Sequence, residues 1–164
     1  AAGLLLGTHL AQRRGFGFVT APTIVAVRVT PFPITIPFRI LKLASEASEL
    51  LARLTGEDVA VDRRTLAPQL VLERRFIGRG YGYATAAGRA AMQLWQEHAG
   101  HELETTYSGK AAAAVIDVVK RASLDGPTLY WSTKSSLPLP SVTPAQLAHA
   151  PAAMRRWMER VRRA

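Results

Sequence analysis

Residues 103–117 read Leu-Glu-Thr-Thr-Tyr-Ser-Gly-Lys-Ala-Ala-Ala-Ala-Val-Ile-Asp, and this stretch decides the interpretation of the chain. Tyr107 and Ser108 stand directly before a glycine and a run of small residues with high helix propensity. Because serine is favourable at the residue that precedes a helix, we expect Ser108 to cap a helix over Gly109–Ala122. The stretch therefore predicts a loop that bears a site and runs into a buried helix.

Strand and helix signals alternate along the rest of the chain. The β-branched run Thr23–Thr30 is too apolar for a strand with one wet face, so it predicts an interior strand of a parallel sheet, covered on both faces. Further strands are expected at Gln69–Phe76 and Thr128–Ser132, and helices at residues 1–12, at Phe38–Leu54 before Gly56, from Thr85 to about His98, and from Thr143 or Pro144 through the terminal arginines. This alternation predicts an α/β fold, a three-layer structure with a parallel sheet and helices on both faces.

The net charge of +9 is concentrated near the C-terminus. Five arginines surround Trp157 in the last ten residues: Arg155, Arg156, Arg160, Arg162 and Arg163. A solvated, arginine-rich helix is the simpler interpretation, and a polyanion-binding tail is the alternative. Since no RNP, zinc-finger or helix-turn-helix pattern accompanies the arginines, nucleic acid is not the expected partner.

The composition favours a cytoplasmic location. The chain contains no cysteine, which is typical of proteins from a reducing compartment. No apolar run reaches the roughly 18–20 residues that span a bilayer, so we expect no membrane helix. The apolar opening Ala1–Gly7 lacks the basic residues of a signal peptide and is predicted to be the start of a buried helix.

Three segments are expected to converge at the carboxyl ends of the strands, where open parallel sheets bind ligands. They are the Pro-rich loop after Val29, the loop at Tyr107–Ser108, and Ser132–Ser136. The glycine-rich turn Gly78–Gly82 is a fourth candidate, because glycines allow a ligand to approach the backbone closely.

Three of these segments resemble motifs of one enzyme family. Gly80-Tyr81-Gly82-Tyr83-Ala84-Thr85 is similar to a Gly-Tyr-Gly-x-x-Thr turn, and Tyr107-Ser108-Gly109-Lys110-Ala111 to a Tyr-(Thr or Glu)-Gly-Lys-(Ala or Ser) motif. Leu129–Thr133 is similar to a strand that ends in His-Thr. The family is that of 1-aminocyclopropane-1-carboxylate deaminase and D-cysteine desulfhydrase, pyridoxal-phosphate enzymes of fold type II with a tryptophan synthase beta-like fold.

The resemblance implies roles for six residues. Tyr107 would lie beside pyridoxal 5'-phosphate and exchange a proton with a small amino-acid substrate; a packed tyrosine with a satisfied hydroxyl is the alternative. Ser108 and Thr133 would lie near the pyridine nitrogen, and Gly80, Tyr81 and Gly82 would contact the cofactor. Ser108 stands where the deaminase members have glutamate, which favours the desulfhydrase-like members.

The resemblance also implies that essential parts lie elsewhere. In the family, the lysine that binds the cofactor covalently lies far upstream of these motifs, and Lys110 is instead expected to be a solvated or helix-terminal lysine. Residues 1–141 would then form the C-terminal portion of the large cofactor-binding domain, and 142–164 a basic helical tail. This chain alone is expected to be inactive, and a homodimer or a complementing N-terminal half would be its partner.

Two other interpretations stay open at this point. In the first, the chain is an α/β domain that is non-catalytic or is one subunit of a split protein. In the second, it is a basic module that binds through its arginine tail. The spacing of His98 and His101 also resembles part of a metal site, but no third ligand pattern accompanies it, so no metal is expected.

Overall fold

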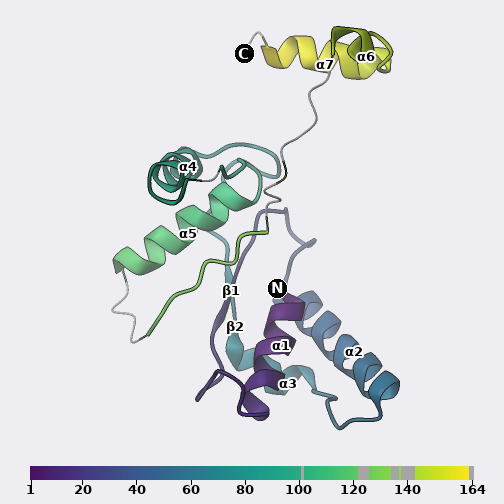
Figure 1. Cartoon of the computed structure of the whole chain (residues 1–164), viewed down its shortest axis with the longest axis vertical. Coiled ribbons are helices and arrows are strands. Elements are labelled where there is room, and N and C mark those ends of the chain that lie inside the picture. Colours follow the sequence, from purple (N-terminus) through teal and green to yellow (C-terminus); the bar gives the residue numbers. More distant parts are fainter. Residues whose placement is uncertain (101, 122–125, 134–136, 138–142, 163–164) are drawn as a thin grey trace. The chain divides into compact units, whose positions relative to one another are not determined.

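The computed structural model describes residues 1–100, 102–121, 126–133, 137 and 143–162. Its internal contacts divide the chain into two compact units, Ala1–Lys134 and Ser135–Ala164 (Figure 1). The boundary expected between residues 141 and 142 lies outside the described residues.

The first unit combines helices with a small parallel sheet. Its elements in chain order are α1 (Ala2–Arg13), β1 (Ile24–Val27), α2 (Pro37–Thr55), α3 (Arg63–Leu66), the 3₁₀ turn η1 (Ala67–Gln69), β2 (Leu70–Glu73), α4 (Ala86–Ala99) and α5 (Ser108–Arg121). β1 and β2 pair in parallel, with Ile24 opposite Leu70 and Val27 opposite Glu73. The α/β class and the parallel pairing are thus confirmed, with two strands among the described residues.

One hydrophobic core lies between α1, α2, α3 and one face of the sheet. Leu5, Ala44 and Leu66 are fully buried in it. The sheet contributes alternate residues to this core, as the two-residue period of a strand requires: Ile24, Ala26, Leu70 and Leu72.

The other face of the sheet is partly open. Val25 and Val71 are paired across the two strands, and their side chains are 43% and 47% exposed. The expectation that Thr23–Thr30 is an interior strand covered on both faces is therefore not met by this chain, and β1 is also shorter than that run.

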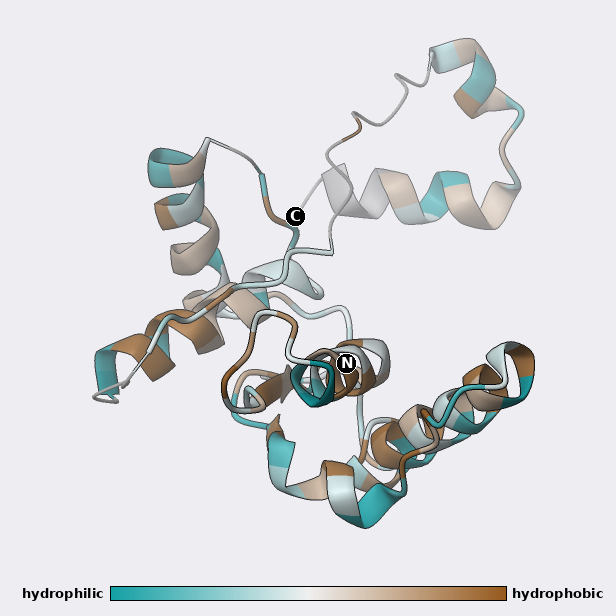
Figure 2. Cartoon of the chain, turned by 60° about the horizontal axis from the view of Figure 1, so that its bottom comes forward, coloured by the Kyte–Doolittle hydropathy of each residue, from teal (hydrophilic) through white to brown (hydrophobic). Residues whose placement is uncertain are grey.

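A second core joins α4 and α5 through small residues. Ala91 of α4 packs with Ala112 and Ala113 of α5, and Leu103 closes the cluster. Gly109 allows α4 to approach closely, because a Cβ at this position would lie 2.9 Å from the Met92 side chain of α4 and 2.9 Å from the Glu104 carbonyl oxygen. Figure 2 shows hydrophobic residues beside hydrophilic ones along these helices, as expected for helices with one packed face.

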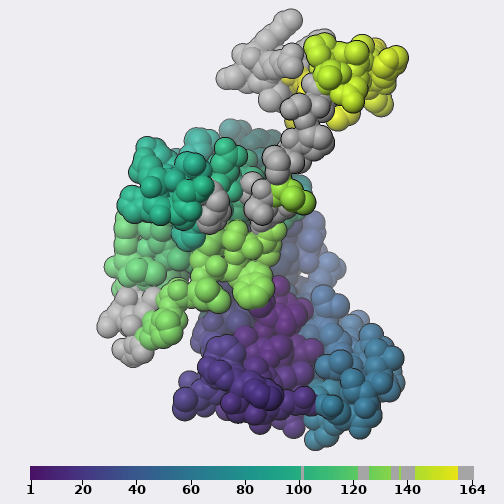
Figure 3. Space-filling model, viewed as in Figure 1, coloured from purple at the N-terminus to yellow at the C-terminus, as the bar shows by residue number. Residues whose placement is uncertain are grey.

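The segment 126–133 is not a strand, which corrects the expectation for Thr128–Ser132. Tyr130 instead places its ring edge-on against Trp95 of α4, with ring centroids 4.7 Å apart, and donates its hydroxyl to the Ser108 carbonyl at 3.0 Å. In the space-filling view of Figure 3, the light-green segment lies against the green α5. Tyr130 thus packs on a helix, whereas Leu129 and Trp131 beside it are exposed, and the segment does not extend the sheet.

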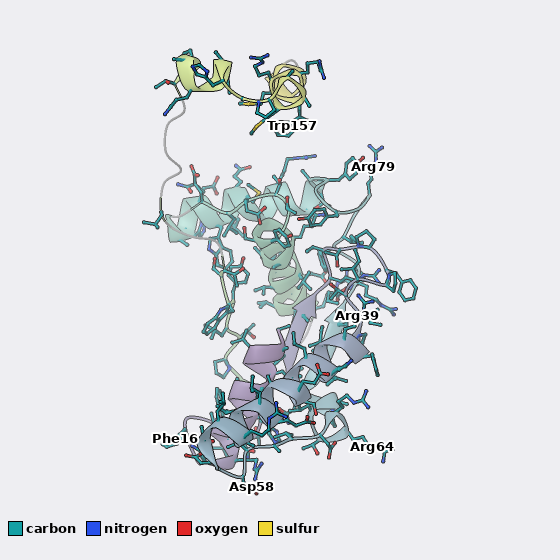
Figure 4. All side chains as sticks on the ribbon, turned by 90° about the vertical axis from the view of Figure 1, so that its right-hand side faces the viewer. Phe16, Arg39, Asp58, Arg64, Arg79 and Trp157 are labelled. Atoms are coloured by element: carbon teal, nitrogen blue, oxygen red, sulfur yellow. The ribbon has the colours of Figure 1, made fainter. Side chains whose placement is uncertain are left out.

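The second unit contains two helices where one was expected. A helix opens at Pro144, as the sequence predicts, and Thr143 caps this helix, α6 (Pro144–Ala148), in a capping box with Gln146. The helix ends before Pro151, and α7 (Ala152–Arg162) begins after it. Arg155, Arg156 and Trp157 are exposed on α7, where Figure 4 labels Trp157.

Candidate functional site

The glycine-rich turn and the loop before α5 meet through two tyrosines. The hydroxyl oxygens of Tyr81 and Tyr107 are 2.6 Å apart, so one hydroxyl donates to the other. The rings are in edge-to-face contact with centroids 5.8 Å apart. Both side chains are about half exposed, at 50% and 47%, so the pair is open to a ligand. The hydrogen bond with Tyr81, followed by partial burial, raises the pKa of Tyr107.

The carboxylate of Glu104 fixes the backbone that carries Tyr107. One oxygen accepts the N–H groups of Tyr107 and Ser108, each at 2.6 Å, and the other accepts the N–H of Thr106 at 2.6 Å. Burial alone would raise the pKa of Glu104, but these backbone hydrogen bonds outweigh burial and lower it. Glu104 therefore satisfies the free N–H groups at the start of α5.

Ser108 does not act as the cap, which corrects the sequence prediction. It is the first residue of α5 and is buried. Its hydroxyl oxygen accepts the Glu104 N–H at 2.7 Å and lies 3.2 Å from a Glu104 carboxylate oxygen. The hydroxyl is thus engaged with Glu104 rather than directed to a ligand, and α5 ends at Arg121 with Ala122 outside the described residues.

Lys110 lies in the first turn of α5, as expected for a helix-terminal lysine, but it is buried, so the expectation of a solvated lysine was wrong. Its side chain is 0% exposed. The ammonium nitrogen donates to the backbone carbonyls of Ile77 and Gly80 at 2.9 Å and 3.0 Å. Burial lowers the pKa of Lys110, while the negative charge of Glu104 acts in the opposite direction. The physical reason for the error is that both carbonyls come from a turn that is distant in sequence.

The glycine-rich turn depends on backbone conformations that favour glycine. Gly78, Gly80 and Gly82 have φ angles of 65°, 144° and 79°. A Cβ at Gly78 would lie 2.4 Å from the Thr85 side chain, so the turn sits directly on the residue that caps α4. Arg79 points outward from this turn in Figure 4. The turn consequently presents Tyr81 toward α5 and leaves Gly82 without a close neighbour among the described residues.

The remaining predicted segments are less closely associated with the tyrosine pair. Thr133 is exposed at the end of the segment that Tyr130 anchors to Ser108, and Lys134–Ser136 lie outside the described residues. The Pro-rich loop is held by its own hydrogen bond between Thr30 and Thr35, at 2.6 Å. Within the described ranges, no hydrogen bond joins this loop to Tyr107. The structure thus brings together the turn and the start of α5.

Sequence reasoning overlooked Glu104 and misassigned Lys110. A glutamate four residues before the first helical residue was a weak signal for the cap, since acidic side chains are favourable at helix N-termini. For Lys110, its place among five small neighbours in residues 109–114 was the available signal of burial.

Comparison with known proteins adds no assignment, because no family model and no curated protein matches the chain. Within the described residues, no group of three or more metal-binding side chains is present, and His101 lies outside them. The helices of the described part are also too short or too polar to cross a bilayer.

Proposed function

We propose that this chain is the C-terminal part of the large domain of a pyridoxal-phosphate-dependent lyase or deaminase of fold type II. It would resemble the D-cysteine desulfhydrase and 1-aminocyclopropane-1-carboxylate deaminase family. The substrate would be a small amino acid, and the covalent lysine would come from another segment or subunit. The observation that supports the proposal is the hydroxyl pair of Tyr81 and Tyr107, which joins two of the three family-like motifs at one exposed place.

The described residues fit the cofactor in part. Tyr81, Tyr107 and Thr133 are exposed residues with hydroxyl groups, and Gly82 has open space where a Cβ would lie, whereas the Gly80 carbonyl already accepts a hydrogen bond from Lys110. Ser108 fits less well as a partner of the pyridine nitrogen, because its hydroxyl is already bonded to Glu104. When bound, pyridoxal phosphate would supply an electron sink for the substrate's α-carbon.

The chemistry of the tyrosine pair suits proton transfer. A phenol that accepts a hydrogen bond from a second phenol keeps its own proton free for a substrate, and the second phenol can then replace that proton along the hydrogen bond. A tyrosine hydroxyl is protonated at neutral pH, and the pKa of Tyr107 is raised further, so Tyr107 would begin with a proton on its hydroxyl. Tyr107 would hold the proton at its Oη, and Tyr81 would orient and recharge it.

The sheet supports completion by another segment. Among the described residues, β1 pairs with β2 alone, so the outer edges of this parallel pair carry no third strand. Parallel sheets occur almost entirely as larger sheets with both faces covered, and an isolated pair of strands is marginal. Further strands from the lysine-bearing half would extend these edges, and its helices would cover Val25 and Val71, to give the three-layer, tryptophan synthase beta-like fold that we propose.

The reading frame upstream of Ala1 provides the first test. A lysine-bearing segment in frame, or in a neighbouring cistron, should yield a complex that binds pyridoxal phosphate and releases ammonia, or sulfide in the case of D-cysteine. Tyr107→Phe in that complex should retain the cofactor and lower turnover by about 10²–10⁴-fold, because it removes an acid–base group but keeps the ring.

Thr133→Val in the same complex should behave differently. Since it removes a hydroxyl expected near the pyridine nitrogen, it should shift the cofactor's absorbance and weaken its retention as well as lowering the rate. Unchanged kinetics in both variants would leave Tyr107 as a packing residue. The second candidate, a non-catalytic split subunit, would then be favoured by assembly with the other half without turnover.

A further inference from the structure

We infer that Lys110 is a positioning residue, whose ammonium group holds the glycine-rich turn so that the hydroxyl of Tyr81 meets that of Tyr107. The inference deepens the proposed function and rests on it, since proton transfer by the tyrosine pair is the activity that such positioning serves. It assigns a role to a lysine that the cofactor chemistry itself does not use.

The bonds of Lys110 close the turn at two points. An ammonium group has three N–H donors, and two of them reach the carbonyls of Ile77 and Gly80, on either side of Gly78 and Arg79. The side chain is 0% exposed, and a buried charge without such partners would be strongly unfavourable. The ammonium and the turn therefore stabilise each other in one arrangement.

Both tyrosines are close in sequence to the residues that this hydrogen bonding fixes. Gly80 directly precedes Tyr81, and Lys110 follows Tyr107 by three residues in the first turn of α5. Tyr107 is itself tied to that turn, because its carbonyl accepts the Ala111 N–H at 3.0 Å. Lys110 and Tyr107 are therefore fixed relative to each other at the start of α5, and the hydrogen bonds from Lys110 hold the turn with Tyr81 against this end of the helix.

The position of Glu104 completes the arrangement. Its carboxylate holds the Tyr107 backbone N–H, and its negative charge favours the charged form of Lys110. Glu104 and Lys110 therefore fix the two halves of the tyrosine pair separately, Glu104 on the α5 side and Lys110 on the side of the turn. Loss of Lys110 would leave Tyr81 held to α5 by a half-exposed hydroxyl bond.

A space-filling role for Lys110 predicts a different result from a positioning role. Methionine has a similar length and is readily buried, so Lys110→Met would preserve packing while removing the donors. Loss of the positive charge alone would not lower the pKa of Tyr107, because removal of a cation can only disfavour the phenolate. Loss of the hydrogen bond with Tyr81 would lower that pKa, so the two effects have opposite signs.

The test uses the full chain with ¹³Cζ-labelled tyrosine and follows the titration of Tyr107 by NMR. We expect Lys110→Met to lower the pKa of Tyr107 toward the ordinary value of a phenol. In a Tyr81→Phe background, where the partner hydroxyl is absent, Lys110→Met should cause no such fall. Lys120→Met is the matched control, since Lys120 is an exposed lysine of the same helix, and it should leave the titration unchanged.

A Tyr107 titration that is unchanged or raised in Lys110→Met would overturn the inference, and so would an equal fall with and without Tyr81. If Lys110→Met does not fold, the wild-type ammonium group provides the measurement. Its protons should exchange slowly with water and show cross-peaks to Ile77 and Gly80, and rapid exchange would refute the positioning role. These measurements need no cofactor, so a failed lyase assay with an intact Tyr107 response would count against the proposed function alone.

Discussion

Glu104 holds the loop that carries Tyr107, and Glu104→Gln would remove its charge while keeping its size. Three backbone N–H groups donate to the carboxylate, each at 2.6 Å. A glutamine keeps one acceptor oxygen, but its amide nitrogen is a donor and would face at least one of these N–H groups. The substitution therefore converts an attractive contact at the start of α5 into one between two donors.

The expected loss follows from these bonds. Removal of a helix-capping acceptor costs about 0.5–2 kcal/mol, and a hydrogen bond to a charged group contributes about 1.5–3 kcal/mol. Because one oxygen remains, we expect the free energy of unfolding to fall by about 2 kcal/mol. For a chain of this length, that loss lowers Tm by about 4–8 °C. Glu102→Gln, two residues away and exposed, should change stability by less than about 0.5 kcal/mol.

The effect of Glu104 should depend on pH with a defined sign. The pKa of Glu104 is lowered in the folded chain, because its backbone hydrogen bonds outweigh burial. Its contribution is therefore complete above the ordinary pKa of glutamate and is lost as the pH falls through the lower, folded-state value. Thermal unfolding followed by circular dichroism should separate wild type from Glu104→Gln at neutral pH and show convergence in acid. Equal Tm values at neutral pH, or a difference that persists in acid, would refute this account of the loop.

Three further changes give independent tests. Gly7→Ala should stabilise the chain by about 0.5–1 kcal/mol, because it lies in a helix where a Cβ meets no described atom within 4 Å, whereas Gly109→Ala should destabilise it through the contact with the Glu104 carbonyl. Urea unfolding measures both, and shifts of the same sign would be inconsistent with the close packing of α4 and α5. Treatment with pyridoxal phosphate and borohydride should leave Lys110 unlabelled in peptide maps because the side chain is buried, and specific labelling there would contradict its assigned place. Deletion of Pro151–Ala164 should leave Tm nearly unchanged and weaken salt-sensitive binding to polyanions; a collapse of the fold would show that α7 is needed by the first unit.

Features that depend on neighbouring residues were predictable from the sequence. Gly56 and Gly100 end α2 and α4 in the left-handed conformation, as glycines after an amphipathic run should. Thr85 caps α4 by accepting the Gly88 N–H at 2.9 Å. Each of these contacts spans no more than one helical turn, so composition and spacing contain the necessary information.

Features that depend on distant partners were not predictable in this way. The carbonyls that bind Lys110 lie 33 and 30 residues earlier in the chain. The β-branched and aromatic residues of Thr128–Ser132 favour a strand, but a strand also needs a free edge beside it, and Tyr130 packs on Trp95 instead. Local pattern identifies which residues prefer burial or extension, whereas the tertiary partner decides how that preference is met.

The start of α5 is where these long-range contacts meet, so we expect a substitution there to disturb several segments at once. Lys110 reaches the glycine-rich turn, Ser108 receives the Tyr130 hydroxyl on its carbonyl, and Glu104 binds the loop from outside the helix. Three segments can approach one helical turn only if that turn is narrow, and Gly109 supplies the space. The same small residues that gave the segment its helical signal therefore also place Tyr107 and Tyr81 within hydrogen-bonding distance.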